Sequence, residues 1–372
     1  MKKYFIIAAA ALVTLAACTK NEADTTAYEQ AKVINFNTVA NKATKAPISS
    51  TVFSSSNAPF GVFAYYLAEG NWNTAAANSS AVSYMSDAEV AFNDTKDIWA
   101  PSDTYYWPLE GKLTFIAYWP QDAATATFSN AGVLTLTGYT LNATVADQDD
   151  LLYSSIAADK NQNESYYVDS EKSKNSETAE GDKGVNIKFK HALSQIIFQA
   201  KTAGDVYDAG LSFKVDAITV NAASTAASMT VTNPLDAQVS ADITTWNTPG
   251  TNVNFAVSST AFPAEANTYL EKTISAPIGD ALLAIPVIAF ADTDPTVTIT
   301  YTLYRLSDDV DLGSKTVIVH FDDIDDVIAA WQAGKKYVYN FTIDLDKIYF
   351  NPTVTDWVDG GTQEFDVPAD AS

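Results

Sequence analysis

The sequence is short of the residues from which most catalytic and metal sites are built. Its 372 residues include one cysteine, Cys18, two histidines, His191 and His320, and one arginine, Arg305. A single cysteine excludes an intrachain disulfide, a thiolate cage for zinc and a redox pair of cysteines. A single arginine leaves almost no means of clamping an anion with the two N–H groups of a guanidinium.

Positive charge is also scarce. The chain has 22 Lys and Arg against 45 Asp and Glu, a net charge of −23, which argues against a nucleic acid partner. Apolar residues are not scarce, since they make up 47% of the chain, so a core can be built. The length favours two domains or one large β domain.

The first 17 residues have the pattern of a targeting segment. Lys2 and Lys3 precede an apolar run from Tyr4 to Ala17, which is shorter than the roughly 20 residues of a membrane-spanning helix and typical of a secretory signal. The run ends in Leu-Ala-Ala-Cys18, which is similar to a bacterial lipobox. We therefore expect Cys18 to be acylated and to hold the protein at a membrane surface. Ordinary signal cleavage beside an incidental thiol is the alternative.

A short alternating segment, Val33 to Val39, follows in the polar region after Cys18. Ile34, Phe36 and Thr38 share one face if this segment is a strand. Lys42 and Lys45 come directly after it, in a stretch rich in Ala, Ser and Thr. The pattern predicts a strand beside a linker that is accessible to proteases.

Strand-like runs separated by turn residues recur along the rest of the chain, which is typical of a β-sandwich. The clearest is Thr296 to Tyr304, where apolar residues alternate with threonines. The predicted fold class is all-β, with two sandwich domains in series. The other expected strands are Phe60 to Leu67, Tyr105 to Pro108, Leu113 to Trp119, Val133 to Tyr139, Asp150 to Tyr153, Gln195 to Ala200, Leu211 to Val220, Ser228 to Thr232, Ile285 to Phe290 and Tyr337 to Ile343.

One short helix is predicted near the C-terminus. Ile324, Val327, Ile328 and Trp331 have helical spacing, acidic residues crowd the expected first turn, and Gly334 follows the last. The polar stretch 158–184 is predicted to be an exposed loop near a domain boundary. The expected organisation is a signal peptide over 1–17, a lipidated segment with the first strand over 18–46, one sandwich over 47–185 and a second over 186–372.

Motifs for catalysis and for metal binding are missing. His191 and His320 have no nucleophile or metal partner placed beside them by a motif, so structural roles are expected. The acidic clusters 147–150, 308–311 and 322–326 lack the spacing of an EF-hand, which favours solvated turns or helix caps over a calcium site. We predict no catalytic residue, metal ligand or cofactor. A glycosidase pair of carboxylates stays open, because such partners can lie far apart in the chain.

The aromatic residues allow a second interpretation. Seven tryptophans and 19 tyrosines could present a flat platform on which sugars stack, although most aromatic residues of a β-sandwich lie in the core or at sheet edges. The tryptophans are Trp72, Trp99, Trp107, Trp119, Trp246, Trp331 and Trp357.

An ordered set of short segments carries a resemblance to a known family. Besides the lipobox at Cys18, the set consists of Phe60 to Ala64, Tyr105 to Pro108, Leu113 to Pro120, Asp150 to Tyr153, Phe189 to Phe198, Ala333 to Tyr339 and Val354 to Trp357. Together these segments resemble the fimbrillin family, the lipoprotein pilins of type V pili in Bacteroidales. The resemblance extends from Cys18 to the tail.

The resemblance implies a fold and a mode of assembly. Family members have two transthyretin-like β-sandwich domains and reach the outer membrane as lipoproteins. A protease then removes the first strand, and a strand of a neighbouring subunit fills the vacated groove, so that other copies or related pilins become partners and the product is a fimbrium. Ile34 and Phe36 would belong to the removable strand. Candidate donor residues lie in the C-terminal segment 349–372: Val354, Trp357, Val358, Phe365 and Val367.

The sequence departs from the family in its processing site. Maturation in the family is often associated with cleavage after arginine, and no arginine precedes Arg305. Lys42 and Lys45 are the only basic residues in the right stretch, which leaves a protease that accepts lysine, or no cleavage. The alternative function is a non-polymerising surface adhesin that binds a glycan or protein of a host or bacterial surface, for example at a fibre tip.

Overall fold

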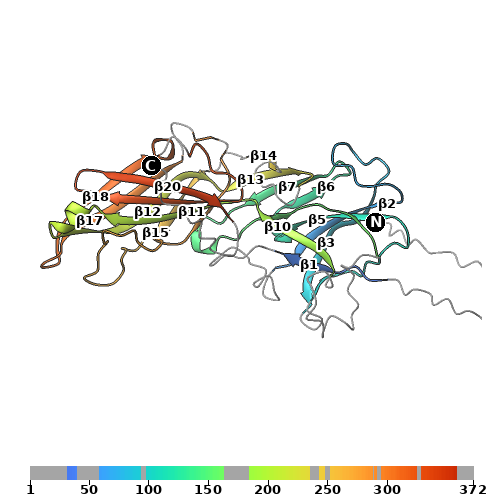
Figure 1. Ribbon diagram of the computed structural model, residues 1–372, viewed down its shortest axis with the longest axis horizontal. Helices are drawn as coiled ribbons and strands as arrows, with labels where there is room; N and C mark the ends of the chain where they lie inside the picture. The colour runs from blue at the N-terminus through green and yellow to red at the C-terminus, as the bar shows by residue number, and fades with distance from the viewer. Residues whose placement is uncertain are drawn as a thin grey trace, which may run out of the picture.

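Strands make up nearly all of the regular structure of this protein, which confirms the predicted all-β class. The computed structural model describes residues 32–39, 58–93, 98–162, 184–234, 243–247, 252–287, 289–290, 295–324 and 328–357. The molecule is elongated, with the first strands of the chain toward one end and the last toward the other (Figure 1).

An eight-stranded sheet occupies the first of these ends. In spatial order it contains β2 (Phe60–Leu67), β3 (Val82–Asn93), β4 (Ile98–Pro101), β1 (Phe36–Val39), β10 (Val185–His191), β8 (Leu152–Ser154), β5 (Lys112–Trp119) and β9 (Ala157–Lys160). Because β2 also pairs with β5, seven of these strands close into a ring. Residues from all seven surround a core of their own inside this ring, rich in Phe and Trp.

The central strands β2 and β5 are buried on both faces. Val62 and Phe115 belong to the core inside the ring, whereas their neighbours Phe63 and Ile116 belong to a second core outside it. A strand covered on both faces needs apolar residues at consecutive positions rather than in alternation. This requirement explains why both segments are almost uninterrupted apolar runs in the sequence.

The second core lies partly under a four-stranded sheet that joins the two halves of the chain. Its order is β14 (Ile243–Asn247), β13 (Ala226–Thr232), β7 (Val133–Thr140) and β6 (Thr125–Phe128). Strand pairing therefore does not follow the boundary expected at residue 185, since β13 comes after that residue and pairs with β7, which precedes it, and β10, which begins at residue 185, pairs with β8. Figure 1 shows β13 beside β7 near the middle of the molecule. The domain ranges themselves stay a prediction.

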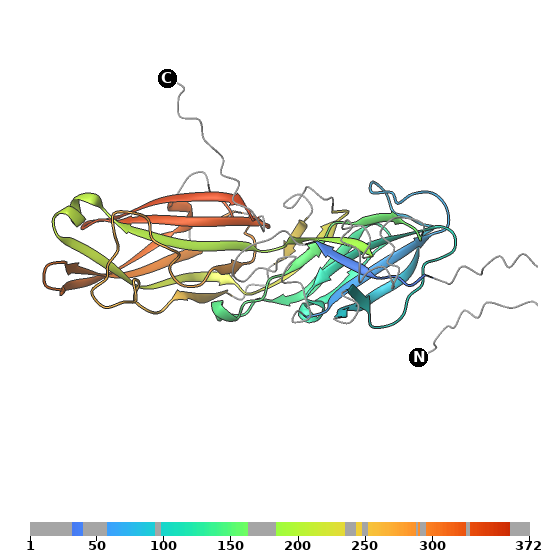
Figure 2. The ribbon, with the colours of Figure 1, turned by 60° about the horizontal axis from the view of Figure 1, so that its bottom comes forward.

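Two further four-stranded sheets form the other end of the molecule. One contains β16 (Leu282–Ala284), β11 (Ser194–Thr202), β19 (Lys335–Ile343) and β20 (Ile348–Asp356), and the other contains β15 (Asn252–Ser258), β12 (Leu211–Ser224), β17 (Thr296–Arg305) and β18 (Val310–His320). Apolar residues of both sheets, such as Phe198 and Phe213, belong to one core. Figure 2 shows that the strands of this end run along the long axis of the molecule.

The helix predicted over Ile324 to Trp331 is wrong for the part that the structure describes. A single 3₁₀ turn, η3 (Phe321–Asp323), precedes it, and Ile328–Trp331 is not helical. Trp331 instead forms a β-bridge with Val287, donates a hydrogen bond from Nε1 to the Tyr339 hydroxyl at 3.0 Å and packs edge-on against Phe321. These tertiary contacts fix the segment in an extended form, which overrides its helical spacing.

Two of the expected strands differ from the structure. Among residues 285–290, those that the structure describes form no strand, and the strand before them, β16, ends at Ala284. The segment Tyr105 to Pro108 contributes only a β-bridge, at Tyr106. The remaining helical elements among the described residues are α1 (Gly204–Asp208), η1 (Gln121–Ala123) and η2 (Val145–Asp147). Within the described ranges, no helix has the length and apolar character needed to span a membrane.

Candidate functional site

The candidate site is the slot that β1 occupies in the wall of the ring. Residues Phe36–Val39 run parallel to residues 185–188 of β10, and on the other side Phe36 pairs with Trp99 of β4. The strand is thus hydrogen-bonded on both sides, as a central strand and not an edge strand. Four residue pairs hold it to β10 and one holds it to β4, so β10 is the principal wall of the slot.

The slot extends beyond β1 toward the N-terminus. Ile34 donates its amide N–H to the carbonyl oxygen of Tyr105 at 2.9 Å, and Trp107 donates to the carbonyl oxygen of Lys32 at 2.8 Å. These two bonds flank an antiparallel bridge between Val33 and Tyr106. The segment 32–39 is therefore held along its whole described length, although the regular strand covers only its second half.

Ile34 and Phe36 fill the floor of the slot, as the alternation of the sequence predicts. Both side chains are 0% exposed. The Phe36 ring packs edge-on against Phe60 and Phe115, with centroid separations of 6.1 and 5.7 Å. Edge-to-face pairs of this kind add to the free energy gained from burial alone.

A glycine marks the point where the wall of the slot approaches the bound segment most closely. Gly184 has φ of +108°, and a Cβ atom built on it would lie 2.4 Å from the carbonyl oxygen of Asn35 and 2.8 Å from the amide nitrogen of Phe36. The next residue, Val185, donates its amide to the same Asn35 oxygen at 2.9 Å. Only glycine allows the wall and the segment to approach this closely.

Gly184→Ala is expected to loosen the segment 32–39 without unfolding the rest of the chain. The added Cβ meets backbone atoms of Asn35 and Phe36, which cannot move aside while β1 stays paired, and the positive φ adds strain. Cleavage after Lys42 and Lys45 by a lysine-specific protease should accelerate several-fold. Gly210→Ala is the matched control, because Gly210 also has positive φ but no heavy atom within 4 Å of the added carbon. Equal cleavage rates in the two variants would count against the slot.

The C-terminal donor candidates are placed unequally. Val354 belongs to β20, which pairs with β19, and its side chain is 42% exposed. Trp357 follows that strand and is only 6% exposed. Val358, Phe365 and Val367 lie outside the described residues, as do Cys18, Lys42 and Lys45, so their predicted roles stay predictions.

Trp357 packs on a buried contact between His191 and Asp150 that the sequence did not reveal. Its ring stacks on the ring of His191 with a centroid separation of 3.8 Å and an interplanar angle of 7°. His191 Nδ1 in turn lies 2.5 Å from Asp150 Oδ2, and the two side chains are 8% and 0% exposed. His191 is the last residue of β10, the principal wall of the slot. Its stacking on Trp357 therefore connects that strand to the start of the C-terminal segment.

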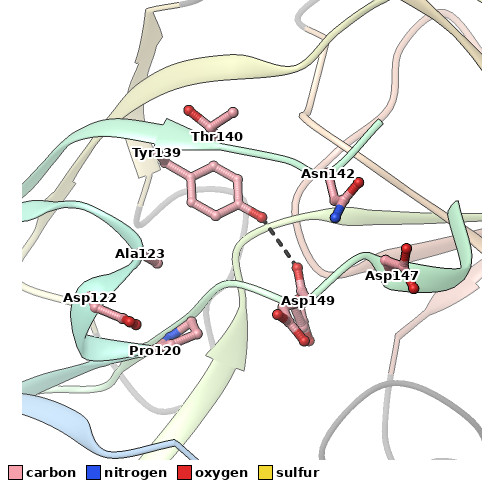
Figure 3. A pocket seen from close by; sticks show the side chains of 9 residues that line it. Pro120, Asp122, Ala123, Tyr139, Thr140, Asn142, Asp147 and Asp149 are labelled. Carbon is pink, nitrogen blue, oxygen red and sulfur yellow. Dashed lines mark hydrogen bonds between the residues drawn. The ribbon is translucent and has the colours of Figure 1, made fainter. Parts of the chain in front are cut away.

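An acidic cavity of about 390 Å³ lies beside Asp150, and Figure 3 shows its lining. Asp122 and Asp147 come from η1 and η2, and Tyr139 donates its hydroxyl to the carbonyl oxygen of Asp149 at 3.3 Å. Within the described part of the chain, no group of three or more His, Cys, Asp or Glu side chains is arranged to hold a metal ion.

Burial and the neighbouring carboxylates of Asp150 and Asp149 raise the pKa of Tyr139 above its ordinary value near 10. A raised pKa stabilises the folded state below pH 10, and this contribution is lost as the pH rises further. The free energy of unfolding should therefore fall above about pH 10. We expect a shallower fall in Tyr139→Phe, measured by urea titration at several pH values, while the exposed Tyr106→Phe should follow the parent. Parallel pH curves for Tyr139→Phe and the parent would contradict this assignment.

The tryptophans do not form the exposed platform that the sequence allowed. Trp246 is partly exposed and the other six are buried, because they pack in the two cores. The interpretation of the tryptophans as a sugar-binding surface is therefore wrong.

The second histidine, His320, is the last residue of β18, where it pairs with Thr296. The exposed large apolar residues include Tyr106 and Tyr349.

Comparison with known proteins gives the same family as the sequence motifs. The model of the fimbrillin-like family matches residues 44–357. A fimbrium subunit, Fim1C, of Phocaeicola vulgatus is 27% identical over 114 residues, so the match spans 30% of this chain and only 29% of that relative. The crystal structure of a fimbrial protein from Bacteroides vulgatus is 19% identical, covers 88% of this chain and 100% of its own, and has a TM-score of 0.56, which shows a shared fold.

Proposed function

The chain belongs to the fimbrillin-like family, and on that premise we propose that it is a structural fimbrial subunit that polymerises by strand exchange. It would be exported as a lipoprotein, anchored in the outer membrane through acylated Cys18, and freed for assembly by proteolysis. Its partners would be other copies or related pilin subunits.

One observation supports the proposal above all others. Strand β1, the first of the described strands, is a wall strand of a closed ring, and the segment 32–39 that contains it places Ile34 and Phe36 at 0% exposure in the core of that ring. Removing this strand would leave backbone groups of β10 and β4 unpaired and would open the core to water. A strand from another subunit would satisfy both, which is the physical basis of β-augmentation.

The energies explain why such a fibre would be durable. Burial of two large apolar side chains contributes about 3–6 kcal/mol, and association costs roughly 4–15 kcal/mol. Backbone hydrogen bonds to the walls of the slot must therefore supply part of the free energy of binding. Once a strand is folded into the ring, its release requires opening of the core. The fibre would therefore last because the strand dissociates slowly, and not because its binding free energy is large.

The position of the lysines gives the proposed trigger. Lys42 and Lys45 follow the bound segment directly, so cleavage after either would cut the slot strand from the body of the subunit. The same cut would separate the body from Cys18 and release it from the membrane. A chain that escapes cleavage would stay tethered with its slot filled.

Deletion of residues 18–45 tests the proposal. The truncated chain should form oligomers that resist mild denaturant, because each copy has an empty slot and an intact C-terminal tail. The full chain with its slot filled should stay monomeric under the same conditions. Size-exclusion chromatography before and after mild urea treatment separates the two, and a truncated protein that is stably monomeric would refute strand exchange.

A further inference from the structure

We infer that two copies of this chain pair side by side through the free edge of β18, with residues 316–320 of each copy in contact. The two strands would run antiparallel about a two-fold axis at Ile318, so that Ile318 lies opposite Ile318 of the second copy. This surface is separate from the slot, because β18 and β1 lie toward opposite ends of the molecule (Figure 1). The inference therefore concerns a lateral contact, which goes beyond the strand exchange proposed above.

The two sheets at this end of the molecule have four edge strands, and three of these are short, blunted or covered. β16 has three residues, and β20 contains Pro352, which has no N–H to donate. The carbonyl oxygen of Val257 in β15 accepts the amide N–H of Asp280 at 3.2 Å. β18 has 11 residues and no proline, and among the described residues it pairs with β17 alone. A long edge strand without such protection is a template for pairing with another strand.

The ladder between β18 and β17 shows which backbone groups face the open edge. In an antiparallel pair, hydrogen-bonded positions alternate with positions that are not hydrogen-bonded. Phe321 donates its amide to the carbonyl oxygen of Pro295 at 3.4 Å, which assigns the odd-numbered residues before it to the hydrogen-bonded positions. The hydroxyls of Thr316 and Thr300 lie 3.0 Å apart, in agreement with this assignment, because side chains are closer at the other positions. The even-numbered residues of 316–320 therefore point their N–H and C=O groups away from β17.

The middle of this segment is apolar on both faces of the sheet. Ile318 is 64% exposed on the outer face, whereas Val317 and Val319 pack partly against the core on the inner face. With the axis at Ile318, the two Ile318 side chains meet, and Val317 of each copy lies opposite Val319 of the other. Pairs of β-branched residues on adjacent strands stabilise a sheet. The contact would also cover an apolar side chain that the single chain leaves in water.

Lys315 favours this register over its neighbours. It lies on the same face of β18 as Val317 and Val319, and a charge on the inner face of an edge strand discourages pairing along its length. With the axis shifted by one or two residues toward the start of β18, the lysine would lie opposite Val319 or Val317. With the axis at Lys315, two ammonium groups would meet. In the inferred register it lies outside the paired segment, opposite Phe321 and near the exposed Asp323 of the second copy, so the charges are complementary.

A single contact of this size is weak. The paired segment is much shorter than the roughly 20–30 residues that each partner contributes to a stable interface, and both copies are strongly acidic. Isolated chains should therefore separate at low concentration. A fibre would repeat the β18 edge in every subunit, and repeated contacts raise the overall affinity without any new contact. The inferred role is thus lateral association between fibres, and this step alone rests on the proposed function.

A single added cysteine tests the register. Cys18→Ser removes the only native thiol of the full chain, and Ile318→Cys then places one thiol at the axis. At high protein concentration this variant should oxidise to a linked dimer, because residues opposite each other in a hydrogen-bonded pair have Cα atoms about 5.5 Å apart, within the range of a disulfide. Leu312→Cys in the same background is the matched control. Leu312 is also exposed on β18, but its two copies would lie about 40 Å apart, so linking should be several-fold slower.

Sedimentation velocity over a series of concentrations gives a second measurement without cross-linking. The Cys18→Ser chain should self-associate as its concentration rises, Ile318→Lys should abolish this association, and Leu312→Lys should keep it. Both lysines would lie on exposed positions, so a urea titration should show that both variants fold like the parent. Equal rates of linking at positions 318 and 312, or monomers of the Cys18→Ser chain at every concentration, would overturn the inference.

These outcomes are independent of strand exchange, because all of these chains keep the segment 32–39 that fills their own slot. Dimers linked through position 318, together with a stably monomeric chain that lacks residues 18–45, would refute the proposed function and leave the lateral contact intact. Oligomers of that truncated chain, together with equal linking at positions 318 and 312, would overturn the lateral contact alone.

Discussion

Phe36→Ala is expected to weaken the hold of the slot on the segment 32–39 by about 3–5 kcal/mol, which is the usual cost of truncating a buried phenylalanine. The residue is 0% exposed and packs against Phe60 and Phe115, so alanine leaves a cavity among rigid aromatic rings. The segment should then dissociate more often while the remainder of the fold persists. Hydrogen exchange of the amides of Ile34 and Phe36, followed by mass spectrometry, measures this loss directly.

Asn35→Ala is the control for this experiment. Its side chain is half-buried, and the contact of Asn35 with the wall at Gly184 and Val185 is made by the backbone, which the substitution keeps. Exchange in this variant should stay close to that of the parent. If Phe36→Ala and Asn35→Ala exchanged alike, Phe36 would not anchor the strand, and the slot would lose its main energetic support.

Asp150→Ala is expected to destabilise the whole fold, by about 1–3 kcal/mol, because it removes the buried carboxylate that contacts His191 Nδ1. Asp150 Oδ2 contacts His191 Nδ1, and Asp150 Oδ1 accepts the amide N–H of Leu151 at 2.8 Å, so two buried interactions are lost together. The free energy of unfolding from urea titration, monitored by tryptophan fluorescence, measures the effect.

The neighbouring residue supplies the control. Asp149 has an exposed side chain, and the contact that Tyr139 makes with it uses the backbone carbonyl, so Asp149→Ala should change the free energy of unfolding by less than about 0.5 kcal/mol. In the double variant Asp150→Ala, His191→Ala, the loss should be smaller than the sum of the single losses. Additive losses would show that the pair is not coupled.

The sequence predicted strands well where one physical requirement dominated. Phe60–Leu67 was predicted with its exact bounds, because a strand buried on both faces must be apolar throughout, and Thr296 to Tyr304 was predicted from its alternation. The helix at Ile324 failed because its apolar spacing also suits an extended segment when a partner such as Val287 is available. The pairing of β13 with β7 was not predictable, since no local pattern specifies a partner some 90 residues away.

The candidate site was predictable only in part, for the same reason. Alternation alone predicted that Ile34 and Phe36 share one face of a strand, and in the structure both side chains are buried. The contact between His191 and Asp150 joins residues 41 positions apart, and the need for glycine at position 184 depends on how closely Asn35 approaches. Both features arise from tertiary placement, although the sequence motifs around residues 150–153 and 189–198 indicated that these segments matter.

The most direct test of the central claim is the identity of the strand that lies between β10 and β4 in the assembled fibre. A cryo-electron microscopy map at side-chain resolution should show that strand continuous with the C-terminal tail of an adjacent subunit, with a phenylalanine between Phe60 and Phe115. Density continuous with the subunit's own residues 32–39 in an assembled fibre would contradict the account.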